Sequence, residues 1–486
     1  MADEIELKLE LTPDAANAFE ASSLMLGEPQ RAEHISVYFD TPDHALNARG
    51  LALRIRRSGR KRLQTVKVSS ACAAGLFTRS EWERALRSDK PILDDTTPIR
   101  ALLGDAVDTI APVFEVRITR HKWLVSEGGA MIELVLDRGE ALVGDRKSPI
   151  CEIELELKEG DPVALFGLAR RIGMVVPVRL GVQTKSERGY RLAGPVATMF
   201  KAEPVALSGD MTADQAFRHI VYNCVRQFRL NEALLLADRN AAALHQARVA
   251  LRRLRSAFSI FKPLVGGDTK TRLSGELRWL SSQLGDARNL DVLLELATTS
   301  ALHDRIVTAH EAAYVRVGDV LASSRVRSLL LDLAEWTAGD DWLNAPDTGV
   351  DHDQSAREFA IAALSRFRRK VKKHGRDLVH ADDATRHETR KDAKKLRYAA
   401  EFFAGLFDHE SEKPRYRNFM GSLEGLLHQL GQLNDLATAS CLLAELGIAD
   451  DPEAVKLLAR GRKKTSLNAA AGSYDALIEA KRFWRA

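Results

Sequence analysis

Ionisable residues at alternating positions mark several short segments in the first 160 residues of the chain. Glu4, Glu6 and Lys8 alternate with apolar residues, and so do Arg54 and Arg56. The same spacing recurs at Thr65/Lys67, Arg79/Glu81/Glu83, Glu115/Arg117, Glu133/Asp137 and Glu152/Glu154/Glu156/Lys158. Alternate side chains of an extended strand lie on one face, so each segment predicts a strand with one ionisable face.

The signs of these charges are segregated between strands. Glu154 and Glu156 share one face, and Arg54 and Arg56 share another. Like charges on one face repel unless an opposite charge lies between them. A closed barrel whose polar faces point inward resolves this conflict if its lumen holds a polyanion and divalent cations. Arg and Lys would bind phosphate oxygens, and carboxylates would hold hard metal ions. The alternative is a solvated sheet whose polar face is rich in charge.

The elements that must position these residues change in period near residue 200. Up to about residue 190 the apolar pattern has period two, with helical segments predicted near residues 13–25, 98–110 and 161–172. After Met211 the period is 3.6, which indicates helices. Residues 194–209 carry Gly and Pro, as is typical of an exposed connector. We predict an α+β domain over residues 1–198, a linker over 199–210 and an all-α domain over 211–486.

The helical half contains an internal repeat. The segment that begins at His245 aligns without a gap with the segment that begins at His387, 142 residues later. Leu284-Gly-Asp-Ala-Arg-Asn-Leu-Asp also resembles Leu430-Gly-Gln-Leu-Asn-Asp-Leu. We therefore expect two related helical bundles, over about residues 211–345 and 352–480.

Each copy of the repeat carries basic residues at the same helical offsets. The first copy has His245, Arg248, Arg252, Arg253 and Arg255, and the second has His387, Arg390, Lys391, Lys394, Lys395 and Arg397. Offsets of 0, 3, 7 and 10 residues lie on one side of a helix, so each copy predicts a basic stripe. Two stripes with little acidic compensation predict a polyanion site. The alternatives are a solvated bundle face and, for the histidines, packing or helix-terminal roles.

Composition excludes several classes of protein. The chain has 486 residues, 45% apolar and 28% charged residues, and a net charge of +4, as expected of a globular protein without disorder. Four separated cysteines, Cys72, Cys151, Cys224 and Cys441, give neither a zinc motif nor a disulfide framework. With no long apolar run and no signal-peptide pattern at residues 1–10, we expect a cytoplasmic protein without a membrane partner.

The first half resembles the CYTH family, also called triphosphate tunnel metalloenzymes. The resemblance rests on Glu4-Ile-Glu6-Leu-Lys8, Tyr38-Phe-Asp-Thr41, Leu53-Arg-Ile-Arg56, Thr65-Val-Lys67, Arg79-Ser-Glu-Trp-Glu83, Cys151-Glu-Ile-Glu-Leu-Glu-Leu-Lys158 and Lys185-Ser-Glu-Arg188. It implies an eight-stranded antiparallel tunnel barrel with flanking helices, which binds triphosphate compounds with Mg²⁺ or Mn²⁺.

The same resemblance implies roles for individual residues. Phosphate-binding residues would be Lys8, Arg54, Arg56, Lys67, Arg117, Lys185 and Arg188. Metal-binding or water-positioning residues would be Glu4, Glu6, Glu83, Asp137, Glu154 and Glu156, with Glu133 and Glu152 as weaker candidates. The predicted catalytic set is Glu4, Glu6 and Lys8, where a metal-bound water would attack a terminal phosphorus.

The helical half resembles the CHAD domain, a helical fold named for its histidines. The residues that carry this resemblance are the two stripes and the two Leu-Gly motifs. It implies a pseudo-twofold pair of bundles with a basic surface that binds inorganic polyphosphate. The Leu-Gly motifs depart from the commoner Arg-Asp pair, with Arg288-Asn289 in one copy and Asn434-Asp435 in the other. We interpret these residues as helix contacts outside the binding site.

Together these patterns predict a metal-dependent inorganic triphosphatase that hydrolyses tripolyphosphate to pyrophosphate and phosphate and binds polyphosphate through its helical half. A non-catalytic polyphosphate sensor is one alternative, and an adenylyl cyclase or organic triphosphatase of the same fold is another. Nucleic acid is the rival polyanion for the stripes, but they lack interleaved aromatic platforms, so we expect condensed phosphate instead.

Overall fold

The computed structural model describes residues 4–25, 27–68, 76–79, 81–296, 300–340, 342–343, 353–459 and 463–485. The chain forms two compact units, residues 1–198 with 327–339, and residues 199–326 with 340–486. Of the residues singled out from the sequence, Cys72, Ser80 and the side chains of Glu4, Arg79, Asn434 and Leu436 lie outside the described part. Within the described part, no helix combines the length and apolarity needed to cross a bilayer.

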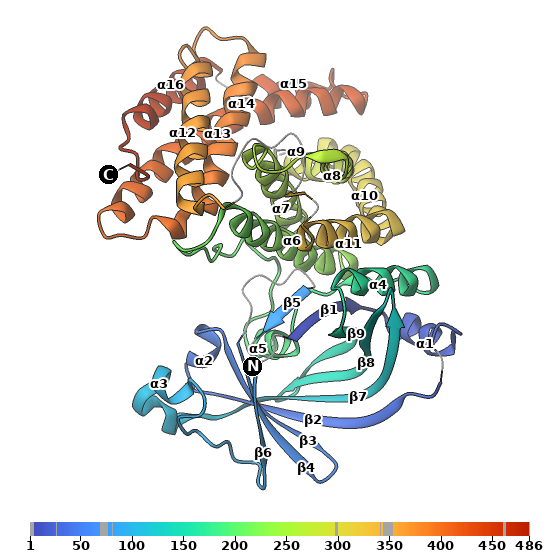
Figure 1. The fold of residues 1–486 in the computed structure, drawn as a ribbon. Helices are drawn as coiled ribbons and strands as arrows, with labels where there is room; N and C mark the ends of the chain where they lie inside the picture. The colour runs from blue at the N-terminus through green and yellow to red at the C-terminus, as the bar shows by residue number, and fades with distance from the viewer. Residues whose placement is uncertain are drawn as a thin grey trace. The chain divides into compact units, whose positions relative to one another are not determined.

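The first unit is built on one antiparallel sheet (Figure 1). Its strands are β1 (Glu4–Glu10), β2 (Gln30–Asp40), β3 (Leu51–Ser58), β4 (Lys61–Val68), β5 (Leu76–Arg79), β6 (Glu81–Leu86), β7 (Ala111–Glu127), β8 (Ala130–Val143), β9 (Arg146–Glu159) and β10 (Arg179–Leu180). The order is β10-β1-β9-β8-β7-β2-β3-β4-β6, and β5 pairs with β1. Since one residue separates β5 from β6 in sequence, these pairings join the two ends of the sheet into a barrel.

The strand count agrees with the expected eight-stranded barrel once two short elements are considered. The described residues form ten strands, of which β10 spans two residues and β5 and β6 follow one another along one side. Counted as one strand, β5 and β6 pair with β1 and β4 respectively. The α+β tunnel class and the all-helical second half are both confirmed.

Helices flank the barrel where apolar strand faces point outward. They are α1 (Pro13–Ala21), α2 (Ala45–Ala48), α3 (Ile99–Leu103), the 3₁₀ helix η1 (Gly104–Thr109), α4 (Val163–Val175) and α5 (Lys185–Ala193). Thr12 caps α1 by accepting from the amide of Ala15, and Pro13 starts the helix where a missing N–H costs nothing. Leu46 of α2 and Ile99 of α3 pack with the outward-facing Leu53 of β3 in one buried cluster.

Helix α5 lies against the barrel and positions one side of its interior. Tyr190 packs edge-on against Phe114 of β7 at 5.0 Å, and its hydroxyl donates to the buried carboxylate of Asp40 at 2.8 Å. A side chain at Gly189 would place its Cβ 2.1 Å from the Phe114 ring, so this close approach requires glycine. A capping box between Thr184 and Glu187 fixes the start of the helix.

The second unit is helical, apart from an isolated bridge between Thr212 and Ser355. Its helices are α6 (Ala213–Ala237), α7 (Ala241–Ile260), α8 (Gly267–Gln283), α9 (Gly285–Leu296), α10 (Ser300–Ala322), α12 (Ala356–His374), α13 (Asp383–Phe402), η2 (Ala404–Leu406), α14 (Glu412–Glu445), α15 (Pro452–Ala459) and α16 (Lys463–Glu479), with α11 (Ser324–Ala338) divided between the units. The repeated segments form α7 and α13, each 20 residues long and capped by Asn240 and Asp382.

Candidate functional site

The barrel encloses a cavity of about 380 Å³ whose lining is mostly charged. Alternate residues of β1, β3, β4, β6, β8 and β9 point into it, as period-two strands require. The charged or hydroxyl-bearing lining residues are Glu6, Lys8, Ser36, Tyr38, Arg54, Arg56, Lys67, Glu81, Glu83, Arg120, Glu133, Glu154, Glu156, Thr184, Lys185 and Ser186. The barrel therefore brings residues from both ends of the first unit around one space.

Arg54 and Arg56 form the cationic side of this cavity. Both lie on β3, and neither forms an ion pair with any side chain that the structure describes. The positive charge of Arg54, together with burial and Arg120, lowers the pKa of Arg56 to about 10. Burial and the guanidinium groups of Arg56 and Arg120 lower the pKa of His34 to about 4, so its imidazole is neutral at pH 7. Burial opposes the charge of Arg54, but Tyr38 and Glu81 outweigh it and raise the pKa of Arg54. No described carboxylate forms an ion pair with Arg56.

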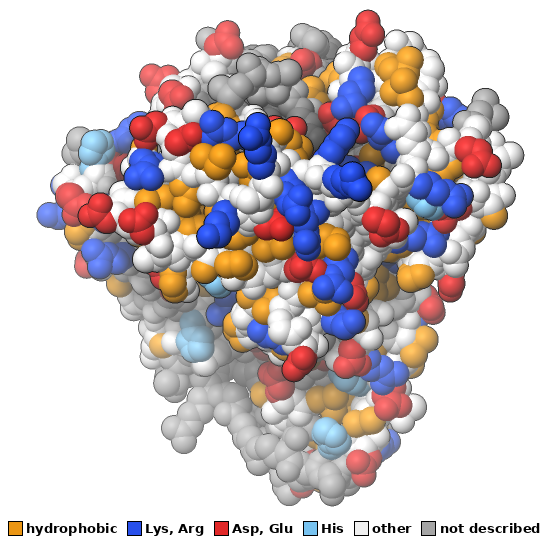
Figure 2. Space-filling view, turned by 90° about the horizontal axis from the view of Figure 1, so that it is seen from below, with side chains coloured by type: hydrophobic (Ala, Val, Ile, Leu, Met, Phe, Trp, Pro, Cys, Tyr) orange, Lys and Arg blue, Asp and Glu red, His pale blue; other side chains and the backbone are white. Residues whose placement is uncertain are grey.

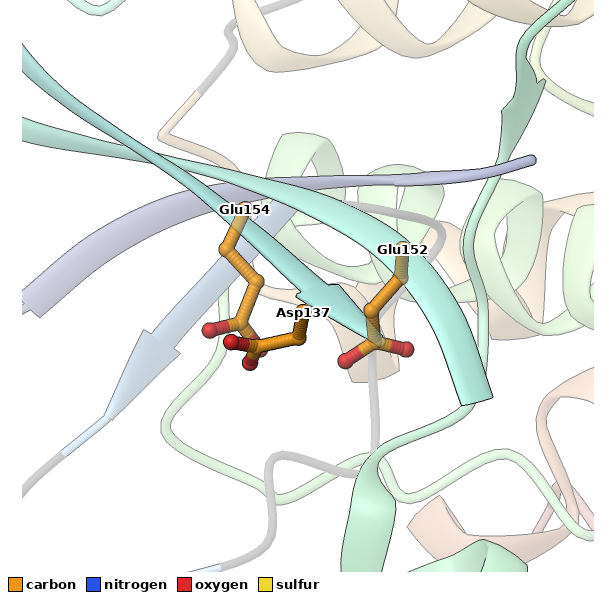
Figure 3. A group of neighbouring side chains, drawn as sticks. All are labelled: Asp137, Glu152 and Glu154. Carbon is orange, nitrogen blue, oxygen red and sulfur yellow. The ribbon is translucent and has the colours of Figure 1, made fainter. Parts of the chain in front are cut away.

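Three carboxylates from β8 and β9 form a buried acidic cluster, and of these three Glu154 alone lines the cavity. Asp137, Glu152 and Glu154 bring one oxygen each within 4.8 Å of one another, a spacing that suits a metal ion. Figure 3 shows the carboxylates of Asp137 and Glu154 directed toward one another, with Glu152 beside them. However, the ammonium of Lys185 lies 2.7, 2.5 and 2.8 Å from Asp137, Glu152 and Glu154 respectively. Lys185 therefore takes the position that a cation would need.

Arg120 of β7 completes this network. Its guanidinium binds Asp137 through two hydrogen bonds of 2.8 and 2.6 Å and reaches Glu154 at 3.0 Å. Burial opposes ionisation of Asp137, but Lys185 and Arg120 outweigh it and lower the pKa of this carboxyl. Burial likewise opposes ionisation of Glu154, whose pKa Lys185, Lys8 and Arg120 hold well below its usual range. Asp137 and Glu154 are therefore ionised, and protein cations already balance their charges.

Three other carboxylates line the cavity itself, where a divalent cation would bind. Glu6, Glu83 and Glu156 line the cavity from β1, β6 and β9. Glu6 contacts Lys8, Glu156 accepts from Lys158 at 2.5 Å, and Glu83 accepts from the Thr65 hydroxyl at 3.3 Å. Carboxylate oxygens around a cavity with room for water are the donor set that Mg²⁺ and Mn²⁺ prefer.

Two predicted phosphate-binding residues lie elsewhere. Arg117 is exposed on the outer face of β7, where it contacts Glu115. Arg188 is not among the residues that line the cavity, and it donates to Glu10 at 3.3 Å. Sequence reasoning missed Arg120, which shares a strand face with Val116 and Ile118. The alternation of Val116, Ile118 and Arg120 could have identified this face, because the face of β7 that carries these apolar residues points into the barrel.

The start of α5 adds hydroxyl groups that the sequence patterns did not suggest. Thr184 and Ser186 line the cavity, and their hydroxyl oxygens lie 2.8 Å apart. The Thr184 oxygen also accepts from the amide of Glu187 at 3.0 Å. One hydrogen bond between two hydroxyls uses one of their two hydrogens, so the pair keeps one donor for an anion.

The helical unit has a basic cavity of its own, of about 560 Å³. Of the fourteen described residues that line it, eight are Lys or Arg and none is acidic: Arg252, Arg255, Lys262, Lys270, Arg278, Lys391, Lys394 and Lys395. We call this space the helical cavity. Burial lowers the pKa of Lys394 to about 7, and Arg390 and Arg252 act in the same direction. Such crowding of cations is costly without a bound anion.

The two basic stripes are not equivalent in the structure. Of their members, Arg252, Arg255, Lys391, Lys394 and Lys395 line the helical cavity, whereas the other six do not. Those six are His245, Arg248, Arg253, His387, Arg390 and Arg397. Sequence reasoning missed Lys262, Lys270 and Arg278, which come from α8 and the segment before it.

Arg253 differs most from its predicted role. It is 2% exposed and donates to the side-chain oxygens of Asn223 and Gln227 at 3.0 and 2.9 Å. Its guanidinium lies over the Phe402 ring at 5.1 Å. Arg253 therefore belongs to the bundle interior.

The histidine of the first stripe is uncharged. Burial and neighbouring arginines, chiefly Arg288, lower the pKa of His245 to about 4, so its imidazole is neutral at pH 7.

The outer surface shown in Figure 2 is mixed in charge. Lys and Arg side chains gather there among Asp, Glu and hydrophobic side chains. The barrel cavity likewise carries both signs of charge, whereas the described lining of the helical cavity is charged by cations alone.

Comparison with known proteins finds a different domain family in each half of the chain. Residues 2–190 match the CYTH domain, and residues 219–444 match the CHAD domain. An inorganic triphosphatase of Haemophilus influenzae is 29% identical over 209 residues, which are 40% of this chain and 55% of that protein, so the match spans about half of the relative's length.

Two solved structures are also similar. The CHAD domain of the plant Ricinus communis is 29% identical, with a TM-score of 0.51, and the match covers 58% of this chain and 98% of that domain. A Hippeastrum protein described as having a dominant triphosphatase activity is 19% identical, with a TM-score of 0.31, and the match covers 38% of this chain and 95% of that protein.

Proposed function

The chain carries a CYTH domain followed by a CHAD domain, and from this premise we propose that it is a metal-dependent inorganic triphosphatase that also binds inorganic polyphosphate. Tripolyphosphate would be hydrolysed in the barrel cavity, and polyphosphate would bind at the helical cavity. The inorganic triphosphatase of Haemophilus influenzae supports the choice of reaction.

One observation carries the proposal for the barrel: Arg54 and Arg56 face an enclosed cavity without an ion pair to any described side chain. The positive charge of Arg54 disfavours that of Arg56, whose pKa is lowered to about 10, whereas Tyr38 and Glu81 raise the pKa of Arg54. A condensed phosphate chain supplies the missing negative charge and accepts paired hydrogen bonds from each guanidinium.

The carboxylates that line the cavity fit the metal ion that such a reaction requires. Glu6 of β1, Glu83 of β6 and Glu156 of β9 offer oxygen ligands in the cavity that Arg54 and Arg56 also line. A divalent cation there would offset phosphate charge and lower the pKa of a bound water. The ion pairs of Asp137 with Lys185 and Arg120 leave that residue to hold the network in place.

The protein's own groups account for the rest of the chemistry. Phosphoryl transfer depends on orienting the phosphate chain and stabilising the charge of a loose transition state. Arg54, Arg56 and Lys67 would bind the phosphate oxygens. The spare hydroxyl hydrogen of Thr184 and Ser186 would donate to a further oxygen. Because these groups are fixed by strands and by the capped start of α5, little reorganisation is needed on binding.

The lining favours an inorganic substrate over a nucleotide. Tyr38 is the one aromatic residue among the described residues that line the cavity. Its ring already stacks on Phe114, with centroids 4.5 Å apart. Among the described lining residues, a nucleotide base would therefore find no unstacked aromatic ring.

The test of the barrel is phosphate release from tripolyphosphate, ATP and thiamine triphosphate with Mg²⁺ or Mn²⁺. We expect tripolyphosphate to be hydrolysed fastest, and Glu6→Gln and Arg56→Gln to lose most of that turnover. Arg57→Gln is the matched control, since Arg57 follows Arg56 on β3 but is not among the cavity residues. Unchanged turnover in both cavity variants would refute the site, and binding without turnover would show a non-catalytic receptor.

The helical cavity carries the second part of the proposal. Eight cations and no acidic residue among its described lining suit a flexible, highly charged chain. We expect Arg252→Glu with Lys394→Glu to abolish retention of polyphosphate while tripolyphosphate turnover stays largely intact. Retention of polyphosphate by that variant would refute this part, as would equal loss of both activities in a folded protein.

A further inference from the structure

A basic stripe on α12 lies outside every site described so far. Arg366, Arg369, Lys370 and Lys373 follow the spacing i, i+3, i+4, i+7, which places them along one side of the helix. Arg369, Lys370 and Lys373 are exposed, and Arg366 is half-buried. We call these four residues the α12 stripe.

Ordinary solvation does not explain the stripe. The sole acidic residue of α12 is Glu358, in its first turn, so no carboxylate on this helix compensates the stripe. Like charges three or four residues apart destabilise a helix. The helix dipole favours cations in the last turn, which accounts for Lys373 but not for Arg366 and Arg369, which lie earlier.

The internal repeat provides a comparison within the same chain. The 142-residue offset between the copies places Cys224, Gln227, Phe228 and Asn231 of α6 at the positions of the α12 stripe. All four are buried, with exposed fractions of 0, 3, 1 and 0%. The first copy thus keeps this helix face inside the fold, whereas the second copy exposes it and makes it basic. The stripe is not a requirement of the shared helical architecture.

The stripe adjoins the helical cavity at two points. Arg366 donates to the carbonyl oxygen of Ile260 at 2.5 Å, two residues before Lys262, which lines the cavity. Lys395 also lines the cavity, and its pKa is lowered by burial and by Lys370. Cations therefore continue from the cavity onto α12.

We propose that the α12 stripe extends the polyphosphate site, so that a chain longer than the helical cavity can hold continues along α12. This inference rests on the proposed binding of polyphosphate by the helical unit. The stripe runs over eight residues, from Arg366 to Lys373, or roughly 10 Å of helix. It would add contacts for long chains alone, so affinity should rise with chain length. A repeating phosphate chain suits it because each unit carries charge and needs no base-specific contact.

The test compares short-chain and long-chain inorganic polyphosphate, each titrated with the full-length protein at several salt concentrations. The variant is Arg369→Gln/Lys370→Gln/Lys373→Gln, which changes exposed side chains only. The control, Arg316→Gln/Lys413→Gln/Arg417→Gln, removes the same charge from exposed positions of α10 and α14 that do not line the helical cavity. Any binding in the barrel is common to all three proteins and cancels in the comparison.

We expect the stripe variant to bind long chains at least about tenfold more weakly than wild type. The slope of its log binding constant against log salt concentration should be shallower by about two. Its affinity for short chains, and both affinities of the control, should not change. Equal losses in the stripe and control variants, or equal losses for both chain lengths, would overturn the extension.

Two further outcomes separate this inference from the proposed function. If wild type binds neither chain, the polyphosphate function itself fails and the extension fails with it. If wild type binds both chains and the stripe variant loses nothing, only the extension fails. Displacement of long-chain polyphosphate by single-stranded RNA at equal charge would show a nucleic-acid surface and would also overturn it.

Discussion

Replacing Lys185 by Met removes the ammonium that lies between three carboxylates. Asp137 and Glu152 have side chains 0 and 3% exposed, and the Glu154 side chain is 13% exposed. Removing one partner of a buried ion pair leaves an uncompensated charge and costs about 3–5 kcal/mol. Since Arg120 and Lys8 remain, we expect Lys185→Met to lower the free energy of unfolding by an amount within that range at pH 7.

The dependence on pH follows from the lowered pKa values of Asp137 and Glu154. Groups whose pKa is depressed on folding stabilise the protein above their unfolded pKa, and this stabilisation is lost as pH falls through the folded pKa. Wild type should therefore lose stability in acid. In the variant the pKa values of these two carboxyls are lowered less. The difference in the free energy of unfolding between wild type and variant should therefore be largest above about pH 5 and should shrink toward about pH 3.

The free energy of unfolding of the barrel can be measured by urea titration with hydrogen exchange of the β8 and β9 amides as the readout. These amides report on the barrel separately from the helical unit. Lys158→Met is the matched control: the Lys158 side chain is 38% exposed and its ion pair with Glu156 should contribute less than about 1 kcal/mol. Equal effects of the two substitutions, or a deficit that does not depend on pH, would refute the role of Lys185 as the internal cation of the network.

Three more predictions concern individual side chains. Arg117→Gln should leave tripolyphosphate turnover unchanged, whereas Arg120→Gln should lower it at least about tenfold, because only Arg120 faces the cavity; a phosphate-release assay of both variants decides this. Polyphosphate affinity should fall as pH rises from about 6 to about 8, because a bound polyanion favours the charged form of Lys394, whose pKa is about 7 in the free protein. Lys394→Gln should flatten that profile in the same titration. Arg253→Met should lower the free energy of unfolding of the helical unit by about 2 kcal/mol or more, because it leaves buried amide oxygens without a donor, and polyphosphate affinity measured below the unfolding temperature should stay the same.

Much of the barrel could be predicted from the alternation of charged and apolar residues. The alternation placed Glu6, Arg54 and Glu154 on the ionisable faces of their strands, and in the structure all three line one cavity. On β7 the same rule chose the wrong face, because both faces of that strand carry charge. Its inward face mixes Val116 and Ile118 with Arg120, so charge alone could not identify it.

The helical unit shows a different limit of sequence reasoning. Helical spacing identified Arg252 and Lys394, which line the helical cavity. Arg253 lies one residue after Arg252 and thus about 100° away around the helix, where the structure buries it. Which of two adjacent arginines faces a cavity depends on the neighbouring helices. The contribution of Lys270 from α8 depends on the same packing, which a single sequence does not specify.

The central claim is that Arg54 and Arg56, which form no ion pair with a described side chain, bind condensed phosphate in the barrel cavity. The most direct test is a crystal structure of the full-length Glu6→Gln variant with tripolyphosphate and Mn²⁺, whose anomalous signal locates the metal. We predict phosphate oxygens within hydrogen-bonding distance of Arg54 and Arg56 and Mn²⁺ between the phosphate chain and the cavity carboxylates. Tripolyphosphate bound elsewhere, with both arginines paired to protein carboxylates, would contradict the claim.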